Sequence, residues 1–145
     1  MVSDLKRIKG GYVLRLRKSK TDQAGNGLEV PLLGKAATAL SDWLVASGVR
    51  EGKLFRGIKA NGALYEGISG QTINRIVKRY ISKLGYDPAE YGAHSLRAGF
   101  ITEAGRRGLP LGESMMLSGH RSVNVAQGYY REGELLSNPS AHLLD

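Results

Sequence analysis

The 145-residue sequence has no cysteine, which excludes disulfide bonds, thiolate metal sites and cysteine nucleophiles. Apolar runs are short as well, and none reaches the roughly 18 residues that a membrane-spanning helix needs. The first residues lack the apolar stretch of a secretory signal. The length suits one domain with at most a modest second lobe. These absences fit a protein of a reducing compartment such as the cytoplasm.

Acidic residues are scarce relative to basic ones. The 21 Lys and Arg outnumber the 13 Asp and Glu, and the net charge is +8. The basic residues are spread along the chain rather than gathered in a tail. This excess indicates a polyanionic partner, because neutralising phosphates supplies most non-specific affinity for nucleic acid. A solvated basic surface would explain the same composition, so charge alone does not decide the function.

The N-terminal part is patterned as a β-hairpin. Residues 12–17 end in alternating apolar and basic side chains, which is typical of a half-buried strand. Turn-forming residues occupy 21–27, and residues 28–32 resume an extended pattern. Pro31 fits only the edge or the end of such a strand, because proline cannot donate a ladder hydrogen bond. The sequence therefore predicts a hairpin with a long tip.

Helical patterns follow the hairpin. Residues 35–47 share an apolar face, and Gly48 is a plausible stop. Residues 50–68 are rich in glycine, and we predict a loop there with a short strand near Leu54 and Phe55. A clearly amphipathic helix begins at Ser69 and ends at Gly85. Its apolar stripe indicates that the helix mainly packs against the rest of the protein. On its basic side, we predict that three residues contact phosphates: Arg75, Lys78 and Arg79.

Three more helices are predicted towards the C-terminus. The first runs from His94 to about residue 107 and is broken by residues 108–110, Gly-Leu-Pro. A short helix covers residues 111–117, and the last covers about 122–135. The fold class is therefore α+β and mainly α, with a small antiparallel hairpin or sheet near the N-terminus.

Two histidines and an arginine in this region have side chains suited to phosphate chemistry. His94 and Arg97 lie three residues apart, which places both on one face of a helix. An imidazole beside a guanidinium can hold one phosphate group. Gly119 permits a tight turn, from which His120 can project into a cleft. Each of these elements taken alone is more often an ordinary surface histidine or helix start.

Tyr129 lies nine residues after His120 on the next predicted helix. A free phenol has a pKa near 10, so roughly one in a thousand is ionised at neutral pH. Such a group becomes a nucleophile only where cations or a base stabilise the phenolate. Tyr130 is adjacent and points about a quarter-turn away, so we expect one of the two rings to be packed.

The ordered set His94-Ser95-Leu96-Arg97, Ser118-Gly119-His120 and Tyr129 resembles the tyrosine recombinases, the family of phage integrases and Xer-type resolvases. The sequence around residues 16–32 also resembles the β-hairpin of that family, whose tip carries a catalytic lysine. Lys20 is the position that we match to it, with Lys18 as the alternative. The likeness covers roughly residues 11–135.

The resemblance implies a fold, an activity and partners. It implies strand cleavage and rejoining on double-stranded DNA through a 3′-phosphotyrosine link, without metal, cofactor or small-molecule substrate. It also implies a homo-oligomer, a tetramer on DNA, for the full-length protein, with no membrane association and a cytoplasmic location. The catalytic residues carried over are Tyr129, Arg97, His94, His120 and Lys20, and the DNA contacts we predict are Arg75, Lys78, Arg79 and Arg121.

One feature of the family is absent from these residues. A further catalytic arginine belongs upstream of the hairpin in a Leu-Arg-x-x-Glu-Leu type pattern, and the sequence contains no match. We therefore expect residues 1–137 to be a partial catalytic domain that binds DNA weakly and cleaves it poorly, if at all. Residues 138–145 are predicted to form a tail that docks on a neighbouring protomer, although a frayed terminus is an equal alternative.

Three other functions fit parts of the sequence. A type IB topoisomerase shares the tyrosine chemistry, but the Gly-His element and the tyrosine spacing favour a recombinase. A non-enzymatic DNA-binding module fits the charge and the helices, yet gives the histidine, arginine and tyrosine set no purpose. A metal site at His94, His120 and His142 lacks clustered carboxylates at ligand spacing and is disfavoured.

Overall fold

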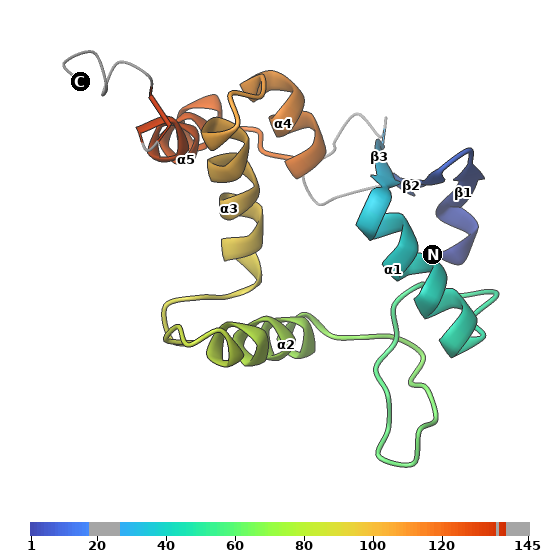
Figure 1. Cartoon of the computed structure of the whole chain (residues 1–145). Coiled ribbons are helices and arrows are strands. Elements are labelled where there is room, and N and C mark those ends of the chain that lie inside the picture. The colour runs from blue at the N-terminus through green and yellow to red at the C-terminus, as the bar shows by residue number, and fades with distance from the viewer. Residues whose placement is uncertain (18–26, 136, 139–145) are drawn as a thin grey trace. The chain divides into compact units, whose positions relative to one another are not determined.

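The computed structural model describes residues 1–17, 27–135 and 137–138 and divides the chain into two compact units, Met1–Thr72 and Ile73–Asp145. The first unit combines a small sheet with one long helix, and the second is helical (Figure 1). Among the described residues, no helix is long and apolar enough to cross a membrane. The α+β, mainly α class predicted from the sequence is confirmed.

The first unit is built on a three-stranded antiparallel sheet with the order β1-β2-β3. Its elements are η1 (Val2–Asp4), β1 (Leu5–Ile8), β2 (Gly11–Leu16), β3 (Leu28–Leu33) and α1 (Gly34–Ser47). Strands β2 and β3 form the predicted hairpin, and Pro31 lies on the edge strand β3 opposite Val13, as its missing N–H requires. The sequence analysis missed β1, because a strand of four residues with two charges carries little periodicity.

Helix α1 packs on β2 and β3. The hydroxyl groups of Tyr12 and Ser41 are 2.9 Å apart, and the indole N–H of Trp43 donates to the carbonyl oxygen of Leu54 at 2.8 Å. Gly48 ends the helix in the left-handed region with φ +64°, as predicted. The predicted strand at Leu54 and Phe55 is wrong: both residues lie in a bend, where Leu54 is buried and its carbonyl oxygen already accepts the indole bond.

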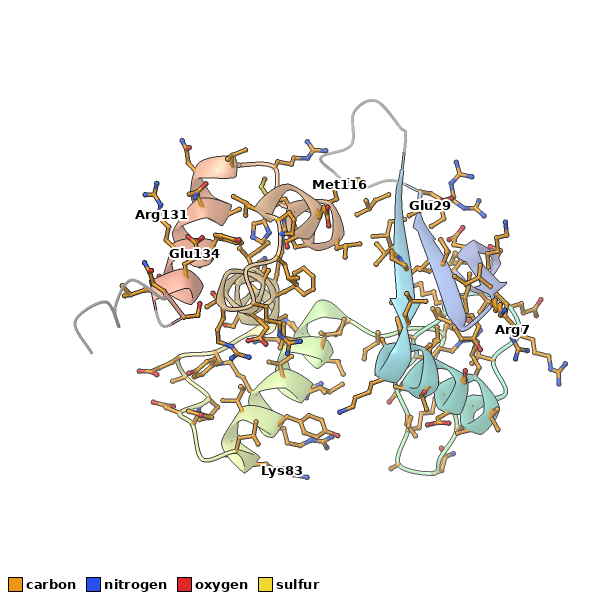
Figure 2. The ribbon with its side chains drawn as sticks, turned by 45° about the horizontal axis from the view of Figure 1, so that its top comes forward. Arg7, Glu29, Lys83, Met116, Arg131 and Glu134 are labelled. Carbon is orange, nitrogen blue, oxygen red and sulfur yellow. The ribbon has the colours of Figure 1, made fainter. Side chains whose placement is uncertain are left out.

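The second unit contains α3 (Ala93–Arg106), α4 (Leu111–Ser118) and α5 (Val123–Leu135), while α2 (Gly70–Lys83) spans the boundary between the units. Helices α3, α4 and α5 pack against one another around a small apolar core. The buried members of that core are Ile101, Ala104, Ala126 and Tyr130. Arg131, the residue after the core residue Tyr130 on α5, points away from the helices (Figure 2).

Two glycines let α3 and α5 approach closely. A Cβ atom at Gly105 would lie 2.1 Å from the carbonyl oxygen of Tyr130, and one at Gly133 would lie 1.9 Å from the carbonyl oxygen of Thr102. Both distances are far inside van der Waals contact, so a side chain at either position would push the helices apart. The backbones of α3 and α5 therefore fix each other's position.

Helix α2 differs from α3 and α5 in that none of its residues is buried. Along its predicted apolar stripe, Val77 and Ile81 are half-buried, whereas Ile73 is 41% exposed and Tyr80 is 56% exposed, so the predicted packing of the stripe stays a prediction. Two polar bonds tie the helix to the following segment. The Asn74 side-chain oxygen accepts from the Ala93 N–H at 2.9 Å, and the Lys78 ammonium donates to the Pro88 carbonyl oxygen at 2.7 Å.

Candidate active site

His94 and Arg97 lie on the first turns of α3, and both side chains are exposed, as a role in binding a ligand requires. Gly92 is the N-cap and has no side chain to cap the helix. Its own N–H donates to the Ser95 hydroxyl at 3.0 Å, and Asn74 accepts from the next N–H instead. The first turn that carries His94 is therefore closed by residues from two helices.

Arg97 connects α3 to the turn between α4 and α5. One terminal nitrogen of its guanidinium donates to the carbonyl oxygen of Gly119 at 2.5 Å. A guanidinium has five N–H groups, so the others remain available for a phosphate. The bond brings the predicted His-x-x-Arg and Gly-His elements together, although they are 22 residues apart.

The turn itself is built by Gly119. This glycine adopts φ +70° at the end of α4, and its N–H donates to the Met115 carbonyl oxygen at 2.8 Å. That conformation is natural for glycine and strained for other residues. Directly after it, Nδ1 of His120 lies 2.7 Å from the hydroxyl oxygen of Ser118. The ring of His120 is thus fixed at one nitrogen.

The two adjacent tyrosines have different surroundings. Tyr129 is half-buried, and its ring centroid lies 6.2 Å from that of His120 at an interplanar angle of 59°. Tyr130 is only 9% exposed, and its hydroxyl donates to the carbonyl oxygen of Leu109 at 2.7 Å. The expectation that one of the two rings is packed is confirmed by the buried ring of Tyr130, while the half-buried ring of Tyr129 lies against the edge of the same core. Tyr129 is the tyrosine placed beside a predicted site residue.

The electrostatic setting of His120 favours its neutral form. Burial lowers the pKa of His120 below its usual value of 6.5, and the positive charge of Arg97 lowers it further. Both effects penalise the imidazolium. At neutral pH the ring is therefore predominantly uncharged and has one nitrogen that can accept a proton.

The predicted DNA contacts occupy three kinds of environment. Arg75 and Arg79 are exposed on α2, and the guanidinium of Arg79 lies 5.5 Å from the ring centroid of Tyr80. Arg121 is exposed in the turn directly after His120. Lys78 is partly buried with its ammonium on the Pro88 carbonyl oxygen, so it has a structural partner that the sequence did not reveal.

Several predicted positions lie outside the described residues. These are the hairpin lysine Lys20 and its alternative Lys18, most of the turn 21–27, the metal candidate His142 and tail residues 139–145. Within the described part of the chain, no group of three or more His, Asp or Glu side chains could hold a metal ion.

Sequence reasoning gave no role to two residues that support the site. Ser118 pairs with His120 and Asn74 closes the first turn of α3. A hydroxyl two residues before a histidine, across a glycine turn, was a readable signal for the first pair. The bond between Asn74 and Ala93 joins residues 19 positions apart on different helices, and no sequence pattern predicts it.

Comparisons with known proteins show the family of this chain. Residues 4–134 match the sequence profile described as the phage integrase family. That match covers most of the chain and includes both histidines, Arg97 and both tyrosines. The fold and the match together define the catalytic domain of a tyrosine recombinase. The chain belongs to the phage integrase family.

Individual relatives are longer than this chain. It is 28% identical over 142 residues to an integrase/recombinase XerD homolog of Selenomonas ruminantium, covering 93% of this chain and 42% of that protein. It is 30% identical over 112 residues to the tyrosine recombinase XerC of Herpetosiphon aurantiacus, covering 74% of this chain and 35% of that protein. The chain thus spans less than half the length of these relatives.

A solved structure has the same fold. The XerH site-specific recombinase, in a post-cleavage complex with its palindromic difH substrate, matches with a TM-score of 0.71 and 21% identity. The match covers 97% of this chain and 38% of that one. At this identity, the likeness establishes the fold alone.

Proposed function

We propose that this chain carries most of the active site of a site-specific DNA recombinase that cleaves and rejoins strands through Tyr129. The observation that supports this most directly is the pairing of the rings of Tyr129 and His120, with Arg97 bonded to the turn that holds His120. Three side chains from α3, the α4–α5 turn and α5 thereby converge from distant points in the sequence.

In the proposed reaction, the phenolic oxygen of Tyr129 attacks the phosphorus of the scissile phosphodiester. A P–O bond forms to the tyrosine, and the bond to the 5′ oxygen breaks. The products are a 3′-phosphotyrosine link and a free 5′-hydroxyl, whose proton is supplied by Lys20. The energy of the phosphodiester is kept in the covalent link, so rejoining by reversal requires no ATP.

The other residues stabilise charge and move protons. Arg97 uses its remaining N–H groups to neutralise the charge that develops on the non-bridging oxygens. His94 is exposed on the same turns of α3, and it and His120 supply hydrogen bonds or proton transfer at that phosphate. Removing one such group typically lowers the rate by about a hundred- to a thousand-fold.

DNA is the proposed macromolecular partner. The +8 charge and the exposed guanidinium groups of Arg75, Arg79 and Arg121 supply phosphate contacts. Lys78 would have to leave the Pro88 carbonyl to contribute. Assembly into a tetramer on DNA, and docking of residues 138–145 on a neighbour, remain predictions for a longer protein.

Residues 1–137 are proposed to form only part of a catalytic domain. The chain spans 42% of the Selenomonas relative, and the Leu-Arg-x-x-Glu-Leu type pattern is not among its 145 residues. A phosphate held by one arginine instead of two is less well neutralised in the transition state. The isolated chain is therefore expected to bind DNA weakly and to cleave it poorly.

The test is a pair of substitutions at the adjacent tyrosines in a full-length version of the protein. Tyr129→Phe is expected to abolish covalent linkage to a suicide DNA substrate, measured as a protein–DNA band that survives denaturing electrophoresis. Tyr130→Phe is the matched control, because it removes the hydroxyl that binds the Leu109 carbonyl oxygen but not the proposed nucleophile. It is expected to keep the linkage.

Other outcomes would favour other functions. Linkage that persists in Tyr129→Phe and disappears in Tyr130→Phe would reassign the nucleophile. DNA binding without linkage in the unmodified protein would support a non-enzymatic DNA-binding module. Relaxation of supercoiled DNA without a specific site would support a type IB topoisomerase.

A further inference from the structure

Ser118 lies between its own helix and the ring of His120. Its hydroxyl oxygen is 2.7 Å from Nδ1 of His120 and 3.3 Å from the carbonyl oxygen of Met115. Gly119, with φ +70°, separates the two side chains and turns the backbone so that they meet. Arg97 holds the same turn from α3 through the Gly119 carbonyl oxygen. Ser118 therefore holds the His120 ring at Nδ1, and Arg97 holds the backbone of the turn that carries it.

We infer that Ser118 is a positioning residue that holds the His120 ring through Nδ1 and selects the tautomer in which Nε2 is an unprotonated acceptor. The role given to that acceptor rests on the proposed function, in which His120 acts at the scissile phosphate beside Tyr129. The hydrogen bonds themselves do not depend on that function.

The tautomer follows from the number of protons available. A serine hydroxyl has one proton, whereas a carbonyl oxygen can only accept. If that proton goes to the Met115 carbonyl, the serine oxygen must accept the bond from His120, and Nδ1 must carry the hydrogen. A neutral imidazole has a single N–H, so Nε2 then has a lone pair.

The position of Nε2 matters for the reaction. The two ring nitrogens are on different edges of an imidazole, so a ring bonded to α4 through Nδ1 directs Nε2 away from α4. The ring also lies beside Tyr129, which occupies the proposed attacking position. An acceptor there can take the phenolic proton: the O–H bond of Tyr129 breaks, an N–H bond forms at Nε2, and the imidazolium returns the proton when the tyrosine leaves.

The experiment reads the tautomer directly by ¹⁵N NMR of the histidine rings in the 145-residue chain at neutral pH. The unmodified chain is expected to show the Nδ1–H tautomer at His120. Ser118→Ala removes one hydrogen bond and is expected to lower the ratio of Nδ1–H to Nε2–H forms roughly tenfold. Ser118→Thr keeps a hydroxyl and is expected to restore the ratio.

Ser114→Ala is the matched control. Ser114 lies one turn earlier on α4, and its hydroxyl likewise donates to a carbonyl oxygen, that of Pro110 at 3.0 Å. The control removes a comparable hydrogen bond from the same helix without touching His120, so it is expected to leave the tautomer unchanged. If Ser114→Ala changed the tautomer ratio of His120 as much as Ser118→Ala does, the change would come from a general disturbance of α4, and the inference would be overturned.

Two further results would also overturn it. One is an Nε2–H tautomer in the unmodified chain, which needs no variant and therefore no assumption about folding. The other is an unchanged ratio in Ser118→Ala. The outcome is independent of DNA cleavage: loss of covalent linkage in Tyr129→Phe with an unchanged tautomer in Ser118→Ala would leave the proposed function intact and reject only the role of Ser118.

Discussion

Helices α3 and α5 meet in close backbone contact, whereas α2 contacts the segment that follows it through polar bonds that include Asn74 to Ala93 and Lys78 to Pro88. The first pair surrounds fully buried Ile101 and meets at Gly105 and Gly133, where no side chain fits. Helix α2 buries none of its residues. Of the proposed catalytic residues, His94, Arg97, His120 and Tyr129 lie on the tightly packed helices and their connecting turn, and three of the four predicted DNA contacts, Arg75, Lys78 and Arg79, lie on α2.

This difference suits the two tasks. Attack on a phosphate requires side chains held to within a fraction of an ångström, which a close-packed pair of helices provides. Phosphate contacts tolerate movement, because long basic side chains adjust to the backbone of DNA. If the proposed roles hold, His94, Arg97 and Tyr129 have the support of packed helices, whereas Arg75 and Arg79 lie on a helix with no buried residue.

The largest effect is expected from a large-to-small change in the core. Ile101→Ala should lower the free energy of unfolding by about 2–5 kcal/mol, because the side chain is fully buried and leaves a cavity. Ile76→Ala makes the same chemical change on α2, where the side chain is 38% exposed, and should cost less than about 1 kcal/mol. Urea denaturation followed by circular dichroism measures both. Equal losses would mean that α2 packs as tightly as α3.

A smaller effect is expected where α3 and α5 touch. Gly133→Ala places a methyl group 1.9 Å from the Thr102 carbonyl oxygen and should destabilise the chain by about 1–3 kcal/mol. Gly128→Ala is the control on the same helix, because a Cβ there has nothing within 4 Å, and it should stabilise by about 0.5–1 kcal/mol. Opposite shifts in melting temperature would support close backbone contact. Stabilisation by both substitutions would contradict it.

The smallest effect concerns the bond between α2 and α3. Asn74→Ala removes the acceptor of the Ala93 N–H and should cost about 1 kcal/mol, as the loss of a helix cap does. Hydrogen exchange at the Ala93 amide should accelerate accordingly. Asn74→Asp retains an acceptor oxygen and should exchange more slowly than the alanine variant. Unchanged exchange in Asn74→Ala would show that the bond does not hold the start of α3.

Most elements of the fold were predictable, because their signals are local. The hairpin of β2 and β3, the five α-helices, and the stops at Gly48 and Gly85 follow from periodicity and turn residues within short windows. Strand β1 was not predicted, because its pairing with β2, rather than the pattern of its own side chains, makes it a strand. Leu54 was predicted to lie in a strand, but it is buried in a bend, where its carbonyl oxygen accepts a hydrogen bond from the Trp43 indole.

The candidate site was predicted as a set of residues and not as an arrangement. The sequence placed His94 and Arg97 on one helix, which the structure confirms. It did not predict that Arg97 binds the Gly119 carbonyl oxygen or that Ser118 binds His120. The assignment of Lys20 stays a prediction, because that residue lies outside the described part of the chain.

The sequence by itself determined the family, because an ordered set of histidine, arginine and tyrosine at defined spacing is a one-dimensional signal. The spacing after His120 already favoured Tyr129 over Tyr130, and the tertiary structure added that the two rings have different surroundings. Helix α5 buries the Tyr130 ring in the core with its hydroxyl on the Leu109 carbonyl oxygen, and it leaves the half-buried Tyr129 ring beside His120. That choice depends on which face of α5 meets α3, and the close approach at Gly105 and Gly133 fixes that face.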